Sequence, residues 1–151
     1  MEPRINYGEV APRAIEAMRM VEQYVRKSGL DPNLLDMIKT RASQINGCAY
    51  CIDMHTKDAL ARGESAQRLF ALDAWRETPL FTDRERVALA WTEAVTRVSD
   101  THVPDEVYKL MRQHFSEKEA VDLTRAVIAI NGWNRLAISL RAVPGSYQPH
   151  T

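Results

Sequence analysis

The sequence predicts an all-α protein, because apolar residues recur at steps of three and four along almost the whole chain. No stretch shows the period-two alternation, bounded by turn residues, that is typical of a strand. Glycines, prolines and polar cap residues divide the chain into segments of helical length with short connections. We therefore expect one domain over residues 1–151, built from about seven helices.

The first two helices are predicted from their end signals. An N-terminal amphipathic helix is expected within residues 10–28, with apolar residues from Ile15 to Val25 and a stop at Gly29. Asp31 and Pro32 provide a cap and a first residue for a second helix. We expect that helix to continue to about residue 45.

The third helix contains both cysteines of the chain. It is expected to begin near Cys48, after a break at Asn46 and Gly47. Gly63 should end it, since glycine readily adopts the left-handed conformation that closes many helices. A fourth helix is predicted after the cap residue Ser65, continuing to about residue 75.

Two capping boxes predict later helix starts, one from Thr82 and Glu85 and one from Ser116 and Glu119. The first box opens a fifth helix that ends at about residue 98, and Pro104 begins a sixth. The second box opens the last helix, which should reach residue 140 and be the longest and most buried.

Composition sets the broad class of the protein. A core over residues 32–142 is expected, with a loose tail over 144–151. A chain of 151 residues can bury about two-thirds of its unfolded surface, so no disulfide is needed for stability. Twenty basic and twenty acidic residues cancel, which argues against a nucleic-acid partner. No apolar segment matches a signal peptide or a membrane span, so we expect a cytoplasmic protein.

Cys48, Cys51 and His55 form one stripe along the third predicted helix, because steps of three and four return to the same face. A pair of cysteines two residues apart can close a small disulfide and reopen it. Cys48 is expected near the positive end of the helix, with Cys51 close to it, where a thiolate is favoured. His55 can accept or supply the proton.

Other interpretations of this stripe remain open. A structural disulfide would close only a very short loop and contribute little. A zinc site would need a fourth ligand, such as Asp36 or Asp53. A c-type haem attachment is excluded because Ile52 follows the second cysteine, and a thioredoxin-like site is excluded because no strands are predicted.

The segment from Arg41 to Thr56 closely resembles the core signature of alkyl hydroperoxidase AhpD-like proteins in the carboxymuconolactone decarboxylase superfamily. The resemblance continues through residues 84–96 and 131–137, and covers about Leu34 to Leu140. It implies an all-α fold that assembles into trimers or hexamers. It also implies that the CxxC pair reduces peroxides. A dithiol donor, either lipoyl-type or another dithiol protein, is then expected to reduce the pair again, and no bound cofactor is expected.

The resemblance also implies residue roles. Cys51 corresponds to the peroxidatic thiol, Cys48 to the resolving thiol and His55 to part of a proton relay. Asp36 stands where the family usually has a glutamate, twelve positions before the first cysteine. Because aspartate is one methylene shorter, its reach to the thiol is expected to be reduced. Tyr50 replaces a histidine that some members carry between the cysteines.

Several further residues have structural interpretations. Capping and a solvated face account for Glu85 and Glu93, although both could approach the thiols. Asn131 and Asn134 indicate a buried hydrogen-bond cluster or an interface. The three tryptophans are expected in the core or at a subunit contact: Trp75, Trp91 and Trp133.

The sequence thus predicts a thiol-dependent peroxidase whose substrate is a hydroperoxide. A thiol-disulfide carrier or redox sensor is the main alternative. A lactone decarboxylase is a weaker one, because that reaction has no need for two thiols at this spacing.

Overall fold

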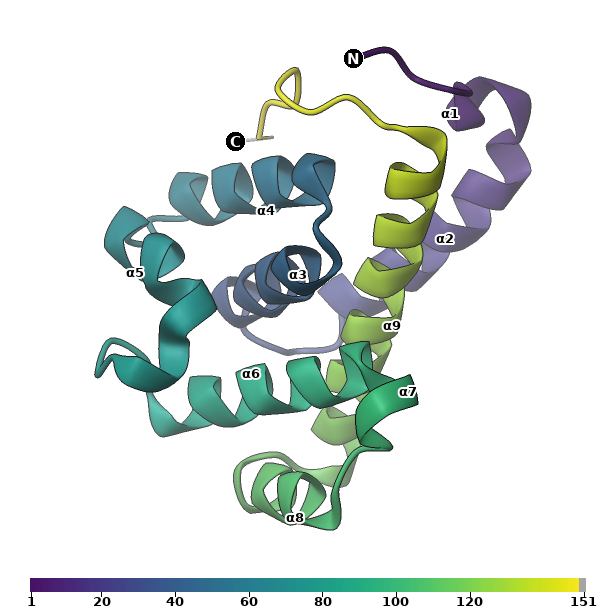
Figure 1. The fold of residues 1–151 in the computed structure, drawn as a ribbon. Coiled ribbons are helices and arrows are strands. Elements are labelled where there is room, and N and C mark those ends of the chain that lie inside the picture. Colours follow the sequence, from purple (N-terminus) through teal and green to yellow (C-terminus); the bar gives the residue numbers. More distant parts are fainter. Residues whose placement is uncertain (150–151) are drawn as a thin grey trace.

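The computed structural model describes residues 1–149, and within them every regular element is a helix, as predicted (Figure 1). The elements in chain order are α1 (Tyr7–Val10), α2 (Pro12–Arg26), α3 (Pro32–Asn46), α4 (Ala49–Ala61), α5 (Ala66–Ala71), the 3-10 helix η1 (Leu72–Glu77), α6 (Asp83–Thr96), α7 (Val98–Thr101), α8 (Asp105–His114) and α9 (Glu117–Leu140). Both predicted capping boxes are present, at the starts of α6 and α9.

Three details differ from the prediction. The short helices α1 and α7 contain no buried residue, so they leave no apolar stripe in the sequence. The fourth predicted helix is broken into α5 and η1, with a non-helical residue at Ala74. Because α1 is added at the N-terminus, the helix that follows Cys48 is α4 and not the third helix.

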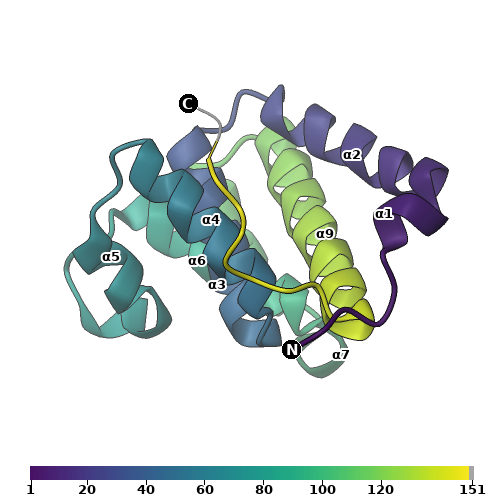
Figure 2. The ribbon, with the colours of Figure 1, turned by 90° about the horizontal axis from the view of Figure 1, so that it is seen from above.

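Helix α3 lies at the centre of the molecule and packs against α4, α6 and α9. Most of its residues are buried, from Leu34 to Ser43, and Ile38 contributes to the main apolar core. Figure 2 shows α2 alongside α9, which the contacts between these two helices confirm. In residues 1–149, no helix combines the length and the hydropathy needed to cross a membrane.

A tight turn places the CxxC motif. Gly47 has a left-handed conformation with φ of 69°, and its N–H donates to the Gln44 carbonyl. The next N–H, of Cys48, donates to the Ser43 carbonyl at 2.9 Å. These two bonds form the glycine-based helix ending that reverses the chain. Residues Asn46 to Cys48 therefore bring the start of α4 back against the end of α3.

The chain leaves α9 and crosses α4 before its C-terminus (Figure 2). The Gly145 N–H donates to Asp53 Oδ2 at 3.1 Å, and the Tyr147 hydroxyl donates to Asp58 Oδ1 at 2.6 Å. The sequence predicted a loose tail over 144–151, but Gly145 and Tyr147 are attached to α4. The last two residues of that predicted tail lie outside the described part of the chain.

Candidate functional site

Two reduced thiols lie where α3 meets α4. Cys48 is the N-cap residue of α4, and Cys51 lies in its first turn. Each residue is 1% exposed, and both pack among Ala42, Ile130 and Ala137. The thiols are therefore shielded from bulk water by the ends of three helices.

The two thiols have different acidities. A hydrogen bond from the Cys51 thiol, with backbone N–H groups of Tyr50 and Cys51 and the Asn134 amide, lowers the pKa of Cys48 to about 7 despite burial. The pKa of Cys51 is raised, because its thiol donates to Cys48, is buried and lies beside the Cys48 charge. Cys48, at the start of α4, is therefore the thiol of the pair that ionises near neutral pH.

A hydrogen-bonded cluster of asparagines from α3 and α9 lies beside the thiols. The fully buried Asn134 accepts a hydrogen bond from Asn46 at 2.8 Å and donates to Ser43 Oγ at 3.0 Å. Asn46 also donates to Asn131 Oδ1 at 3.0 Å. The buried cluster that the sequence predicted is present, and Asn134 has the additional role of stabilising the Cys48 thiolate.

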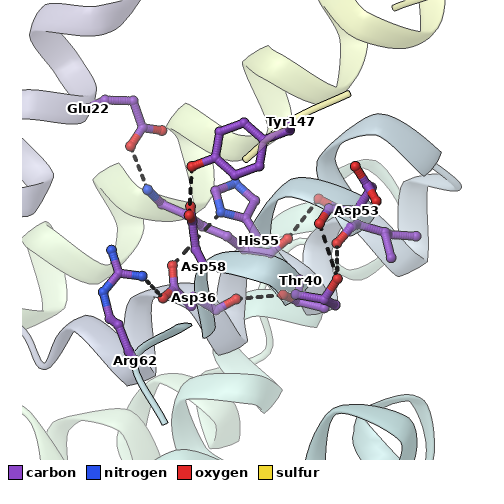
Figure 3. A network of polar contacts seen from close by, with 12 residues as sticks. Glu22, Asp36, Thr40, Asp53, His55, Asp58, Arg62 and Tyr147 are labelled. Carbon is purple, nitrogen blue, oxygen red and sulfur yellow. Dashed lines mark hydrogen bonds and ion pairs between the residues drawn. The ribbon is translucent and has the colours of Figure 1, made fainter. Parts of the chain in front are cut away.

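His55 extends from α4 toward Asp36 of α3 (Figure 3). His55 Nδ1 lies 3.9 Å from Asp36 Oδ1, too far for a hydrogen bond. Within residues 1–149 this buried nitrogen has no hydrogen-bond partner. Burial, together with the charges of Lys39, Arg26 and Arg62, holds the pKa of His55 well below its usual value. The imidazole is therefore neutral at physiological pH.

The Asp36 carboxyl group is also unusual. Burial raises its pKa to about 6, an effect that the nearby Asp58 reinforces and the charge of Arg62 opposes. Arg62 donates to Asp36 Oδ2 from the last turn of α4 (Figure 3). A carboxyl group with a pKa near 6 can gain and lose a proton close to neutral pH. The structure thus brings the four predicted residues together as two neighbouring pairs, Asp36 with His55 and Cys48 with Cys51, and the cavity described below is lined by one member of each, Cys51 and His55.

A buried ion pair borders this group. Lys39 of α3 donates to Glu22 of α2, and both side chains are largely covered. Glu22 is thus the charged member of an otherwise apolar helix face because it neutralises Lys39. The positive charge of Lys39 in turn disfavours protonation of His55.

A cavity of about 620 Å³ opens beside these residues. Cys51 and His55 line it, whereas Cys48 is not among its described lining residues. The rest of the wall is mixed. It contains four aromatic residues from four separate elements, Tyr7, Tyr50, Trp133 and Tyr147, together with six charged residues: Glu16, Arg19, Glu22, Arg26, Lys39 and Asp58. A small organic molecule in this cavity could reach the Cys51 sulfur without access to Cys48.

The residues with metal-ligand chemistry form a set different from the one the sequence suggested. Ligand atoms of Asp36, His55 and Asp58 lie within 4.8 Å of one another. In the structure, Arg62 donates to Asp36 and Tyr147 donates to Asp58. A cation could bind all three only by competing with these bonds, and neither cysteine belongs to the set.

Sequence reasoning missed three residues close to Asp36 and His55. Asp58 and Arg62 continue the stripe of Cys51 and His55 at steps of three and four, so helical periodicity could have identified them. Tyr147 gave no signal, because it lies in a segment without regular structure.

The structural interpretations of Glu85 and Glu93 have different outcomes. Glu85 completes the capping box of α6, as predicted. Glu93 is buried and accepts hydrogen bonds from Arg41, Trp75 and Arg76, so the prediction of a solvated face is wrong. Among the tryptophans, Trp75 and Trp91 lie in the core, while Trp133 lines the cavity.

Known proteins share both the sequence and the fold. The carboxymuconolactone decarboxylase family matches residues 10–94. The uncharacterized protein YdfG of Bacillus subtilis is 41% identical over 140 residues, which cover 93% of this chain and 95% of YdfG. A protein of unknown function from Agrobacterium tumefaciens, whose name links it with the antioxidant defence protein AhpD, is 42% identical with a TM-score of 0.94. That alignment covers 97% of this chain and 100% of the Agrobacterium chain.

A more distant structure shows the fold alone. The debrominase Bmp8 is 18% identical with a TM-score of 0.80, over 89% of this chain and 73% of its own. The same helical arrangement therefore occurs in a protein named for a different reaction. On the family match and the coverage by close relatives, the chain is an AhpD-like member of the carboxymuconolactone decarboxylase family.

Proposed function

We propose that this protein is a thiol-dependent peroxidase that reduces hydroperoxides. The observation that carries the proposal is the position of Cys51, which lines the cavity while donating a hydrogen bond to the Cys48 thiolate. One sulfur is thus accessible to a small substrate, and its partner holds the negative charge. For Cys51 to act as the nucleophile, a proton must shift from Cys51 to Cys48, against the resting preference for the charge on Cys48.

The first step forms a bond between Cys51 Sγ and the terminal oxygen of the hydroperoxide. The oxygen–oxygen bond breaks, Cys51 becomes a sulfenic acid, and the alkoxide takes up a proton to leave as an alcohol. Cys51 loses two electrons, and the peroxide gains them. The aromatic residues among those that line the cavity suit the organic group of an alkyl hydroperoxide.

The second step closes the disulfide. Cys48 Sγ attacks Cys51 Sγ and displaces hydroxide, which takes the proton from Cys48 and leaves as water. The two thiols already interact before the reaction, because the Cys51 side chain contributes to the lowered pKa of Cys48. An external dithiol, of the lipoyl or protein type, then returns two electrons and two protons to the pair.

His55 and Asp36 supply the alkoxide's proton. His55 is neutral, and its unpartnered Nδ1 faces Asp36, whose pKa is near 6. For this transfer, the 3.9 Å separation between Nδ1 and Oδ1 must close by a movement of the side chains. The acid can then pass a proton through the imidazole toward the cavity, and solvent restores it.

Serine variants of the two cysteines test the proposal. We expect Cys51→Ser to abolish the reduction of cumene hydroperoxide, measured with dithiothreitol as the reductant. Cys48→Ser should retain one stoichiometric oxidation of Cys51, detected as a sulfenic acid by mass spectrometry, and lose turnover. The surface variant Glu117→Gln is the matched control, since its side chain is 90% exposed.

Two outcomes would contradict the proposal. Retention of peroxide reduction by Cys51→Ser, with loss in Cys48→Ser, would reverse the roles of the thiols. Negligible peroxide turnover by the wild-type protein, together with fast exchange with a protein dithiol, would identify a disulfide carrier.

A further inference from the structure

The C-terminal segment of residues 144–149, here called the strap, is attached to the helix that carries the thiols. Lys57 of α4 donates to the carbonyls of Gly145 and Tyr147 at 3.2 and 3.1 Å. Asp53 of α4 accepts from the Gly145 N–H, and Lys57 also bonds to Asp53 at 3.0 Å. The strap is therefore fastened along one side of α4 by polar contacts.

Tyr147 carries the strap to the cavity. Its ring lines the same cavity as Cys51 and His55, and its hydroxyl donates to Asp58 (Figure 3). Burial and the Asp58 carboxylate raise the pKa of Tyr147 to about 12, so the phenol stays protonated and keeps this bond at physiological pH. Asp58 is thus both a neighbour of Asp36 and the anchor of Tyr147.

Burial of the thiols creates a difference between reagents of different size. A hydroperoxide or another small molecule can reach Cys51 through the cavity. A macromolecular dithiol must bring its own sulfur against a residue that is 1% exposed. Such a reagent therefore needs one wall of the cavity to move away.

The strap is a wall of the cavity that can move without unfolding a helix, whereas movement of the short helix α1, which contributes Tyr7 and Gly8, would displace a helical segment. The remaining walls come mainly from helices α2, α4 and α9, which pack against each other or against α3. The strap has no regular secondary structure, and hydrogen bonds to α4 side chains attach it. Local opening favours segments of this kind, with few buried apolar contacts.

We propose that Tyr147 is a specificity-determining residue, which with the strap admits small molecules to Cys51 and excludes macromolecular dithiols until it separates from Asp58. The inference deepens the proposed peroxidase function, because it concerns which partners reach the same thiol. Peroxide reduction would proceed with the strap closed. Reduction of the Cys48–Cys51 disulfide by a protein partner would require the strap to open.

Labelling of Cys51 by reagents of two sizes tests this proposal without any turnover. The protein is prepared as Cys48→Ser, so that Cys51 is the one remaining cysteine of the full chain. Iodoacetamide is the small reagent, and a maleimide joined to a long polyethylene glycol chain is the large one. The ratio of the two labelling rates reports the opening of the strap.

Tyr147→Ala should raise the rate with the large maleimide by about tenfold or more, since it removes a hydrogen bond to a carboxylate and the ring itself. The iodoacetamide rate should change by less than about threefold, because the small reagent does not require opening. Tyr147→Phe should give a smaller, still size-selective gain. Tyr108→Ala, on α8, should change neither rate.

A second variant covers the case in which Tyr147→Ala does not fold. Lys57→Gln removes the two bonds to strap carbonyls and should produce the same size-selective gain. Equal gains with both reagents would show that Tyr147 alters the thiol chemistry and not access, which overturns the proposal. No gain with either reagent would overturn it too.

The result is independent of the peroxidase proposal. If the protein fails to reduce hydroperoxides, the labelling ratio still shows whether the strap controls access. If the ratio is unchanged by these variants, peroxide reduction can still be measured with the serine variants of the thiols.

Discussion

Two buried carboxylates of this molecule behave in opposite ways. Asp36 of α3 is 6% exposed and Glu93 of α6 is 8% exposed. Burial raises the pKa of Asp36 to about 6. Burial acts in the same direction on Glu93, but hydrogen bonds from Trp75, Arg76 and Arg41 outweigh it, and the pKa of Glu93 is lowered.

The number of donors accounts for the difference. Glu93 accepts from Arg41 Nε at 2.8 Å, Trp75 Nε1 at 2.9 Å and Arg76 at 2.5 Å. The described contacts of the Asp36 carboxylate are a bond from Arg62 and the distant His55. A carboxylate with a full set of donors keeps its charge and connects helices, whereas one with few donors can exchange a proton.

The largest effect is expected from Glu93→Gln. The change removes the buried charged partner of Arg41, which retains the exposed Asp73, and loss of one member of a buried pair costs up to about 3–5 kcal/mol. Urea denaturation should show this loss of stability. The pKa of the Cys48 thiol should stay near its wild-type value, since Glu93 is not among the groups that act on it.

A neutral result for Glu93→Gln would break the comparison. If stability matched that of the exposed variant Glu117→Gln, the three donors of Glu93 would have no net structural value. A shift in the Cys48 pKa would instead connect this ion-pair cluster with the thiol site.

Asp36→Asn should have the next largest effect on stability. It should stabilise the protein, whereas Glu93→Gln should destabilise it. The folded-state pKa near 6 exceeds the unfolded value of 3.8, so the folded protein holds a proton that the unfolded chain has lost. Stability therefore falls as pH rises from about 4 to about 6, and the full loss persists at neutral pH. Asparagine removes this loss and should stabilise the protein at pH 7 by about 1–3 kcal/mol.

Peroxide turnover of Asp36→Asn should decrease at the same time, by about a hundredfold, since general acid catalysis is lost. Denaturation at pH 4 is the control, because the stability difference should shrink there. A variant that is less stable than the wild type at pH 7 would show that the bond from Arg62 outweighs the burial of Asp36.

The difference between the two carboxylates also explains what the sequence could predict. The family that the sequence resembles has an acidic residue at a fixed spacing before the CxxC motif, and this spacing identified Asp36. Helical periodicity identified His55. The donors of Glu93 lie 52, 18 and 17 residues away along the chain. No local pattern encodes such a meeting, so Glu93 was assigned to a solvated face.

The fold follows the same division between local and distant information. Helix starts at Thr82 and Ser116 were predicted because a capping box lies within four residues. The docking of Tyr147 depends on a hydrogen bond to Asp58, 89 residues away along the chain, and no local signal marked the non-helical residue at Ala74. Similarly, the sequence placed both cysteines near the positive helix end, but their mutual hydrogen bond lowers the pKa of Cys48 alone.

The smallest effect is expected from Asn134→Ala, which extends the comparison from carboxylates to the thiolate. Asn134 is one of several donors to Cys48, so its loss should raise the Cys48 pKa by about one unit.

The pH dependence of iodoacetamide labelling measures the Cys48 pKa, with a wild-type midpoint expected near pH 7. Asn131→Ala is the matched control, because Asn131 shares the Asn46 partner and is not among the groups that act on the thiols. Equal shifts in the two variants would mean that the asparagine cluster acts by holding the helices in place. A shift confined to Asn134→Ala would show that donors set the charge of the thiolate as they do for Glu93.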